Sequence, residues 1–440
     1  MFFIALFIAK CADWIIHTFQ LGSGSTWPGE IALRLDPHFI IHSLRNSSVR
    51  IILIAGTNGK TTTSLLVVRG LKNAGKTVMH NSEGANLLNG VASTLLRARS
   101  LSGSSIFEYA VFELDENALS TLLQYITRPY AVLLLNLFRD QLDRYGEVHS
   151  ISTRWMKTLS GLPKETHVII NGDDPRLAYI GSQLGRDIFY FGAESQDKQK
   201  KDIPHDVDSV HCPVCGTKLV YQSMSYSHLG DYRCQNCGFS SPDKWIDAIV
   251  PLEQLPGVYN RYNIRAALSL LHFALPISFE KSRELLTGVE PAFGRQERFT
   301  ALGKNWIVIL SKNPSGFNQS IESLKELLGM NKTTICLILN DRIPDGTDVS
   351  WIWDVEFEKV FLHADTVITS GDRTYDMAIR METECNQNLE SKLKLIAEPA
   401  LKKALELCVK NHESQSPIVV LATYTGMLEA RKILIGRKLL

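Results

Sequence analysis

The sequence predicts an α/β protein with parallel sheets, and three features of the chain support this prediction. Short apolar runs alternate with stretches of helical spacing in the first half of the chain. The same alternation begins again in the last third, which indicates a second, Rossmann-like α/β unit. Between the two, the composition changes and four cysteines occur in two Cys-x-x-Cys pairs. We therefore expect a helical lead-in at 1–45, a central domain at 46–298 with an insertion at about 205–245, and a C-terminal domain at 299–440.

The length and composition describe a large and nearly neutral protein. A chain of 440 residues exceeds one ordinary domain, and its 45% hydrophobic content is enough for a sizeable core. A net charge of +1 gives no electrostatic footprint for nucleic acid or for an anionic membrane surface. Four further cysteines, at positions 11, 336, 385 and 408, are scattered without an even framework. This usage suits a reducing compartment, so we expect a cytoplasmic protein.

The chain begins with nine uninterrupted apolar residues, Met1 to Ala9. This run lacks the positively charged start of a signal peptide. Lys10 and Asp13 end it far short of the roughly 20 residues that span a bilayer. Two interpretations stay open: a helix that packs on the protein, and an interfacial helix that lies on the inner face of a membrane.

Runs of apolar residues place the expected strands. The first run, 51–55, is continuous, ends at a glycine and suits a buried parallel strand. Helical spacing follows at 62–74, and ligands of such sheets collect at the carboxyl ends of the strands. The other expected strands are 109–114, 130–135 and 167–170 in the central domain, and 306–310, 334–339, 366–369 and 418–422 in the C-terminal domain.

The turn after the first strand has the composition of a phosphate-binding loop. Its two glycines allow tight backbone geometry, and the helix that follows presents free N–H groups to an anion. A lysine and a threonine at the start of this helix are placed to reach the β- and γ-phosphates of ATP and to hold Mg²⁺. Ile54 stands where the usual motif has its first glycine. The expected ATP-binding residues here are Gly56, Thr57, Asn58, Gly59, Lys60, Thr61 and Thr62.

Carboxylates end the next expected strand, where a magnesium–ATP site requires hard oxygen ligands. Glu113 lies near the end of this strand, and Asp115 and Glu116 follow it. We expect carboxylates of this segment to bind Mg²⁺ together with the hydroxyl of Thr61 or Thr62. A solvated cluster of charges is the alternative interpretation of these acidic residues.

The string Gly-Thr-Asn-Gly-Lys-Thr-Thr at 56–62 resembles the ATP loop of the Mur ligases and folylpolyglutamate synthases. The resemblance implies that Glu113 binds magnesium, that Asn263 contacts adenine and that Arg295 neutralises phosphate charge. It also makes Asp173 a candidate nucleotide contact, although a plain turn explains that residue almost as well. Further segments that resemble the family lie at 136–147, 171–175, 257–267 and 294–298, and the first departs from the family pattern at Arg139 and Gln141.

The paired cysteines follow the pattern C-x2-C-x18-C-x2-C, which is a strong signal for zinc. Four thiolates close a tetrahedron and leave no open position, so the expected Zn²⁺ is structural, and its loss should cost stability rather than chemistry. Two disulfides are the alternative, and they do not suit a cytoplasmic chain. The expected ligands are Cys212, Cys215, Cys234 and Cys237.

The resemblance is narrower than the whole Mur ligase family. Only about 45 residues precede the central domain, too few for the sugar-binding domain of ordinary Mur ligases, which also lack a four-cysteine ribbon. Segments 80–86, 312–316 and 345–354 resemble the MurT branch, the synthetase subunits of lipid II isoglutaminyl synthases. This branch implies ATP-dependent amidation of the D-glutamate α-carboxylate of lipid II through an acyl phosphate.

The resemblance to the MurT branch also implies a partner. Ammonia is expected from a GatD-type glutaminase in a heterodimer, with Asp348 completing the catalytic triad of that glutaminase. From sequence alone Asp348 could equally be a turn carboxylate like Asp345. Two other functions compete with this one: a Mur-type or folylpolyglutamate-synthase-type ligase that joins an amino acid to a carboxylate, and a non-catalytic nucleotide-binding module. The intact Lys60, Thr61 and Glu113 argue against the second of these.

Overall fold

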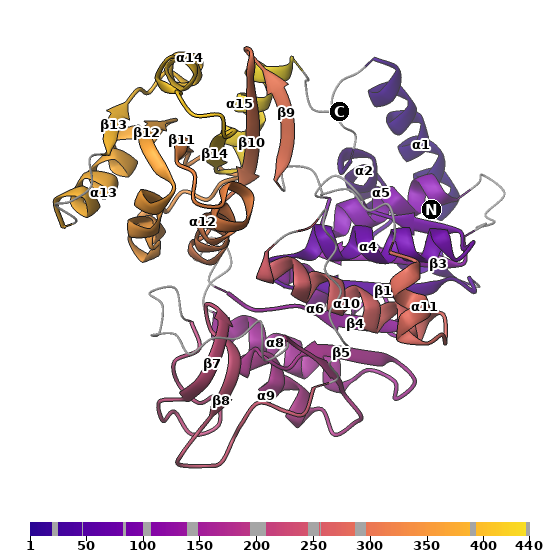
Figure 1. Ribbon diagram of the computed structural model, residues 1–440. Helices are drawn as coiled ribbons and strands as arrows, with labels where there is room; N and C mark the ends of the chain where they lie inside the picture. The colour runs from indigo at the N-terminus through magenta and orange to yellow at the C-terminus, as the bar shows by residue number, and fades with distance from the viewer. Residues whose placement is uncertain are drawn as a thin grey trace.

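The described part of the chain forms two six-stranded sheets and a separate two-stranded hairpin (Figure 1). The computed structural model describes residues 1–19, 25–45, 47–81, 85–99, 107–138, 148–193, 208–244, 255, 257–286, 296–387 and 393–436. The expected α/β class with parallel sheets is confirmed. Within the described ranges, no helix combines the length and apolar character that crossing a bilayer demands.

The first sheet has the strand order β2-β3-β1-β4-β5-β6, and all of its pairs are parallel. β1 lies between β3 and β4, so the loop after β1 opens at the middle of the carboxyl edge, where doubly wound sheets bind ligands. The strands are β1 (Arg50–Ala55), β2 (Val78–His80), β3 (Tyr109–Leu114), β4 (Ala131–Leu134), β5 (His167–Asn171) and β6 (Phe189–Phe191).

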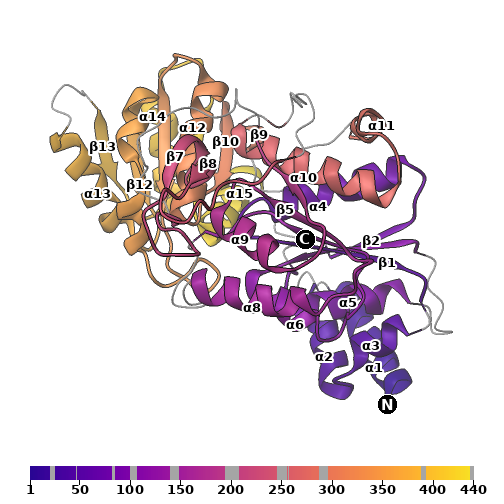
Figure 2. The ribbon, with the colours of Figure 1, turned by 90° about the horizontal axis from the view of Figure 1, so that it is seen from below.

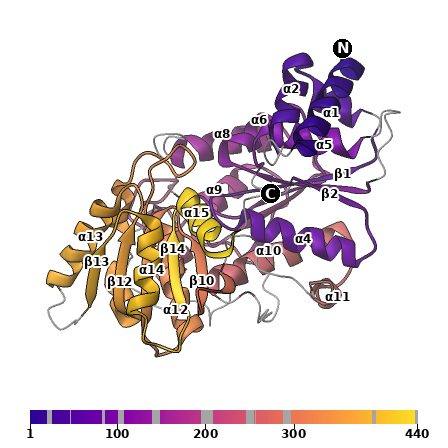
Figure 3. The same ribbon diagram turned by 90° about the horizontal axis from the view of Figure 1, so that it is seen from above.

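Helices cover both faces of this sheet, as its strands, apolar on both sides, require. Figure 3 shows α4, α10 and α11 on one face, and α5, α6 and α8 on the other with α1 and α2 outside α5. Figure 2 shows α3 beside α1 and α2 in that outer layer. The helices are α1 (Phe2–Thr18), α2 (Trp27–Leu35), α3 (Phe39–Leu44), α4 (Lys60–Asn73), α5 (Leu88–Ala98), α6 (Glu116–Leu122), α8 (Val148–Ser160), α9 (Pro175–Gln183), α10 (Val258–Ala274) and α11 (Phe279–Glu284).

The second sheet has the order β13-β12-β11-β14-β10-β9 and is parallel except for its edge strand β9. Its strands are β9 (Glu297–Ala301), β10 (Lys304–Leu310), β11 (Thr333–Ile338), β12 (Ala364–Ser370), β13 (Lys394–Ala397) and β14 (Ile418–Ala422). Its helices are α12 (Pro314–Leu328), the 3₁₀-helices η2 (Ser350–Asp354) and η3 (Phe357–Leu362), α13 (Thr374–Gln387), α14 (Leu401–Asn411) and α15 (Tyr424–Ile435). One apolar core joins the sheet to α12, η2, η3 and α13, and another joins it to α14 and α15.

The insertion forms the hairpin of β7 (Val220–Tyr226) and β8 (Leu229–Arg233). Two cysteines precede β7 and two follow β8, so both Cys-x-x-Cys turns lie at the open end of the hairpin. The connecting turn at the other end packs into the central domain, where Tyr226 and Leu229 join the core beneath α4 and α10.

Candidate functional site

The loop between β1 and α4 has the geometry of an anion cradle. Gly59 has a φ of +84°, and a Cβ at this position would lie 2.1 Å from Oδ1 of Asn263. Gly56 has a φ of +154°, and a Cβ there would lie 2.8 Å from the Cβ of Leu135. Both positions therefore require glycine, because a side chain would be strained and would collide with the strand or helix behind the loop.

Lys60 begins α4 and is buried within the loop. Its Nζ donates to the carbonyl oxygens of Gly56 at 2.6 Å and Thr57 at 3.0 Å. The carboxylate of Glu116, also buried, lies 3.6 Å away. The ammonium thus lies over the cradle and is held by groups that a phosphate oxygen can replace.

Glu113 and Thr61, the expected magnesium ligands, lie in contact with each other. Glu113 is 2% exposed, and its Oε1 accepts from the Thr61 hydroxyl at 3.3 Å. Its Oε2 accepts from the Ser64 hydroxyl at 3.1 Å, and Nε2 of His80 lies 3.0 Å from the Ser64 oxygen. The backbone of Glu113 is fixed by Asn81, whose Oδ1 accepts from its N–H at 2.9 Å. These contacts place a hydroxyl and a carboxylate, the hard donors that Mg²⁺ prefers, together beside the loop.

His80 makes this cluster sensitive to acid. Desolvation by burial lowers the pKa of His80 from 6.5 to about 4, with a smaller contribution from Lys72. The folded protein therefore holds a neutral imidazole, whereas the unfolded chain binds a proton near pH 6.5. The resulting stability is complete above pH 6.5 and is lost as the pH falls towards 4, at about 1.4 kcal/mol per unit of pKa difference.

We expect His80→Gln to flatten the decline in the free energy of unfolding between pH 6.5 and 4. Urea denaturation of both proteins at several pH values measures this. His17→Gln, a change at an exposed histidine of α1, is the matched control and should leave the decline unchanged. Identical pH profiles for wild type and His80→Gln would contradict the assignment.

Asn263, the expected adenine contact, lies directly behind the loop on α10. Its Oδ1 lies 3.4 Å from the Thr63 hydroxyl, and its Nδ2 donates to Oδ1 of Asn260 at 3.3 Å. Thr57 is anchored from the other side, because its hydroxyl oxygen accepts from the N–H of Phe138 at 3.0 Å. The loop is therefore held between α10 and the segment after β4.

The second domain closes over this loop. Nδ2 of Asn313, the residue that caps α12, lies 3.3 Å from Oδ1 of Asn58. A cavity of about 40 Å³ remains between the domains. This cavity is smaller than the several hundred Å³ of an ordinary small-molecule site. The cavity is lined by Asn58, Gly59, Thr62, Tyr226, Tyr259, Asn263, Ile309, Leu310, Gly316, Gln319 and Ser320.

Asp173 has an internal structural role. It is fully buried, its Oδ2 accepts from the N–H of Ala193 at 2.7 Å and the hydroxyl of Tyr262 at 2.7 Å, and its Oδ1 is paired with Lys244. The turn explanation is therefore the better one for this residue. Arg295 lies outside the described residues, as do 82–84 and 139–147 of the segments that resemble Mur ligases.

Asp348 lies on another part of the molecule, at the surface of the C-terminal domain just before η2. Its Oδ1 accepts from the N–H of Ser350 at 2.8 Å, which fixes the exposed carboxylate. The neighbouring Asp345 is buried instead and accepts from the N–H and the hydroxyl of Thr425. Large apolar side chains are exposed in the same part of the domain, among them Ile343 at 79% and Trp353 at 50%.

The four paired cysteines converge on one point. Their sulfur atoms all lie within 4.8 Å of one another, and the pairs Cys212–Cys237 and Cys215–Cys234 are 3.6 and 3.5 Å apart. Tetrahedral zinc with Zn–S bonds of about 2.3 Å requires sulfurs about 3.8 Å apart, so the four thiols fit one such ion. All four cysteines are free rather than disulfide-bonded.

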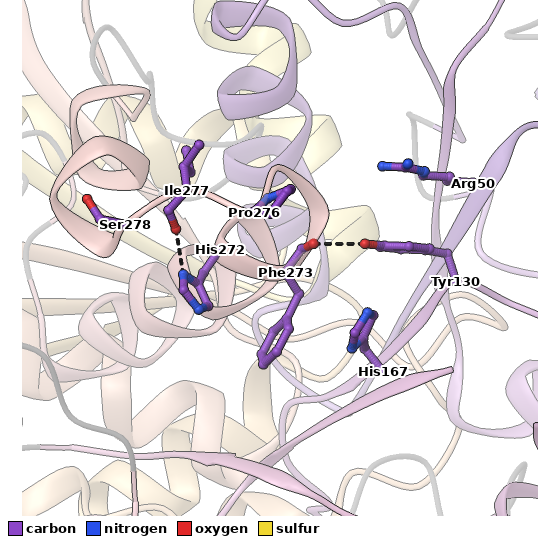
Figure 4. A pocket seen from close by; sticks show the side chains of 8 residues that line it. All are labelled: Arg50, Tyr130, His167, His272, Phe273, Pro276, Ile277 and Ser278. Atoms are coloured by element: carbon purple, nitrogen blue, oxygen red, sulfur yellow. Dashed lines mark hydrogen bonds between the residues drawn. The ribbon is translucent and has the colours of Figure 1, made fainter. Parts of the chain in front are cut away.

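A larger cavity, of about 610 Å³, lies at the opposite, amino-terminal edge of the first sheet (Figure 4). Its polar groups are largely bonded within the protein: the Tyr130 hydroxyl donates to the carbonyl of Phe273 at 2.8 Å, and Nδ1 of His272 lies 2.6 Å from the carbonyl oxygen of Ile277. This cavity is remote from the loop and contains none of the residues expected at the site.

Comparison with known proteins agrees with the geometry. Residues 54–271 match the Mur ligase middle domain, and residues 310–427 match the MurT ligase C-terminal domain. The lipid II isoglutaminyl synthase (glutamine-hydrolyzing) subunit MurT of Streptococcus pneumoniae (strain ATCC BAA-255 / R6) is 33% identical, over 96% of this chain and 94% of that protein.

The chain belongs to the MurT family.

The MurT subunit of Staphylococcus aureus (strain COL) is 29% identical, over 90% of this chain and 92% of that protein. Among solved structures, a pseudomurein peptide ligase type C from Methanothermus fervidus has the same fold, with a TM-score of 0.65 and 21% identity over 88% of this chain and 78% of that one. The expected ligase class and the Mur ligase fold are therefore confirmed. Both MurT relatives align with this chain over nearly their whole lengths.

Proposed function

We propose that this chain activates the α-carboxylate of the D-glutamate in the lipid II stem peptide and converts it to D-isoglutamine. The observation that carries the proposal is the cluster of Lys60, Thr61 and Glu113 at the centre of the carboxyl edge, in a chain whose MurT relatives are named lipid II isoglutaminyl synthase subunits. In this proposal the central domain, 46–298, binds ATP, and the C-terminal domain, 299–440, closes over the ATP site.

In this proposal the loop residues Gly56 to Thr62 bind the phosphates, and Lys60 reaches the β- and γ-phosphates. Thr61 and Glu113 hold Mg²⁺, which neutralises charge on the transferred phosphoryl group. Asn263 contacts the adenine and Arg295 the phosphates. The position of Asn263 behind Gly59 supports its assignment.

The proposed reaction has two steps. A carboxylate oxygen attacks the γ-phosphorus and ADP leaves, which gives an acyl phosphate. Ammonia then attacks the carbonyl carbon, inorganic phosphate leaves, and a proton is lost from nitrogen to give the amide. The protein contributes alignment and charge stabilisation, since a carboxylate without a leaving group is a poor electrophile.

A GatD-type glutaminase is the proposed source of ammonia. The two MurT relatives are named as subunits of a glutamine-hydrolyzing enzyme, which supports a partner of this chemistry. Asp348 is proposed to orient the catalytic histidine of the partner. Its fixed, exposed carboxylate, in the same segment of the chain as the exposed Ile343 and Trp353, suits such an interface.

We also propose that the four cysteines bind structural Zn²⁺.

We further propose that the chain acts at a membrane surface, where its lipid-linked substrate lies. One face of α1 supports the membrane contact: Ala5, Leu6 and Ala9 are buried, while the opposite face is apolar and exposed. Exposed aromatic and aliphatic side chains without charge suit the boundary between headgroups and hydrocarbon. The exposed face contains Phe3, Ile4, Phe7, Ile8, Trp14 and Ile15, with exposures from 41 to 66%.

We expect Ile4→Glu with Phe7→Glu to lower binding to phosphatidylglycerol-containing vesicles about ten-fold or more, because carboxylates are costly at that depth. Vesicle co-sedimentation measures the bound fraction. Met330→Glu is the matched control, since Met330 is 95% exposed on the other domain. If the wild type, the double variant and Met330→Glu bind equally well, α1 does not contact the membrane.

The proposed function is tested by incubating the chain with lipid II, Mg-ATP and ammonia, and then with a glutaminase partner and glutamine. The expected product is lipid II whose mass shows one carboxylic acid converted to an amide, located by fragmentation at the α-carboxylate of D-glutamate. Attachment of an amino acid in place of ammonia would contradict the proposal.

A further inference from the structure

The tip of the cysteine-bearing hairpin is buried, although hairpin tips usually face solvent. Tyr226, Ser227, His228 and Leu229 have exposures of 7, 4, 0 and 0%. The seven-residue strand β7 spans roughly 20 Å, so this tip lies far from the four cysteines at the open end. The hairpin thus connects the cysteine cluster to the interior of the central domain.

Polar contacts clamp the tip in place. The N–H of Gly230 donates to the carbonyl of Asp173 at 3.1 Å. Lys244 bridges two carboxylates, with Nζ paired with Asp173 and 2.7 Å from Oδ1 of Asp231 on β8. The hydroxyl of Tyr262, bonded to Asp173, also lies 3.1 Å from Oγ of Ser225 on β7. Asp173 and Tyr262 are buried and the Lys244 side chain is 7% exposed, which makes these contacts costly to break, while the Asp231 carboxylate is partly exposed.

The clamp presents one hairpin side chain to the nucleotide cavity. Tyr226 packs edge-on against Tyr262, with ring centroids 5.5 Å apart and an interplanar angle of 85°, and lies 5.8 Å from the ring of Phe138. It lines the cavity between the domains together with Gly59, Thr62 and Asn263. An aromatic ring at such a position is a stacking surface for a purine base.

We infer that Tyr226 is a binding residue for the adenine base, and that the metal-bound cysteine cluster positions it through the hairpin. This inference rests on the proposed function, because it adds one residue that contacts the base to the proposed ATP site. It also changes the role expected for the cysteines. Their loss lowers nucleotide affinity in addition to stability, because the open end of the hairpin is held together by the metal.

The test measures the affinity of the full chain for a non-hydrolysable ATP analogue and for inorganic tripolyphosphate by calorimetry. Tyr226→Leu keeps apolar volume without a ring, Tyr226→Phe keeps the ring, and Gln222→Ala changes an exposed residue of the same strand. We expect Tyr226→Leu to bind the analogue at least about five-fold more weakly while its tripolyphosphate affinity stays near wild type, at a temperature where circular dichroism shows the variant to be folded. The Phe and Gln222 variants should match wild type.

A second arm uses Cys215→Ser, measured for metal content and for secondary structure at the assay temperature. We expect this variant to lose the metal and the analogue affinity together while it still binds tripolyphosphate. Wild-type affinity for the analogue in Tyr226→Leu, or in metal-free folded Cys215→Ser, would overturn the inference. A wild-type chain that binds neither ligand would overturn the proposed ATP site itself.

Discussion

Lys60→Ala should reduce lipid II amidation at least about a hundred-fold with either nitrogen source, since it removes the cation aimed at the transferred phosphoryl group. Lys60 is the cation whose Nζ lies over the loop, on the carbonyl oxygens of Gly56 and Thr57. The measurement is the initial rate of amide formation with saturating ammonia, so that no glutaminase step limits the rate.

Two controls separate chemistry from folding in this experiment. Lys72→Ala removes an exposed lysine from the last turn of the same helix and should keep full activity. Because Lys60→Ala leaves the buried Glu116 without its neighbouring cation, Lys60→Ala with Glu116→Gln should restore stability but not activity. Recovery of amidation in the double variant would show that Lys60 acts only by balancing charge in the fold.

Asp348→Asn should abolish most of the glutamine-driven reaction, by about a thousand-fold or more, and leave the ammonia-driven reaction nearly unchanged. An amide in place of the carboxylate cannot stabilise a protonated histidine in the partner. Asp348 is exposed and lies apart from the loop, so its replacement should not change the rate of the ammonia-driven amidation.

Asp345→Asn is the matched comparison, three residues away in the same segment. Its buried carboxylate accepts two hydrogen bonds from Thr425, so its replacement should destabilise the C-terminal domain and lower both reactions equally. If Asp348→Asn behaves like Asp345→Asn and lowers both rates in parallel, the triad role of Asp348 is wrong.

Much of the fold could be predicted from the sequence because buried parallel strands are continuous apolar runs. The expected strands at 109–114 and 418–422 coincide with β3 and β14, and the others agree to within two residues at either end. The sequence does not predict β2, β6, β9 and β13 of the two large sheets, nor β7 and β8 of the hairpin. The first two have three residues each, β9 and β13 are edge strands, and neither short nor half-covered strands produce a long apolar run.

Some contacts of the site can likewise be predicted from the sequence, and others cannot. The pairing of Thr61 with Glu113 could be expected, because both residues lie at carboxyl ends of adjacent parallel strands or just beyond them. The contacts of His80 and Tyr226 could not, because each depends on how a distant segment folds back. Glu116 is one of the acidic residues expected near the loop, but the sequence does not predict its contact with Lys60.

Asp173 illustrates the limit of motif reasoning. The sequence offered a nucleotide contact and a turn almost equally, and only its burial beside Lys244 and Tyr262 decides for structure. The converging cysteines are the opposite case, since their spacing alone predicts one tetrahedral cluster.

The most direct test traces the transfer of an oxygen atom from the substrate carboxylate to inorganic phosphate. Lipid II labelled with ¹⁸O in the α-carboxylate of D-glutamate is converted with ATP and ammonia, and the released inorganic phosphate is analysed by mass spectrometry. Phosphoryl transfer from ATP held by the loop at 56–62 predicts that one labelled oxygen appears in each phosphate formed, with ADP as the other product. Unlabelled phosphate, or formation of AMP, would contradict the account.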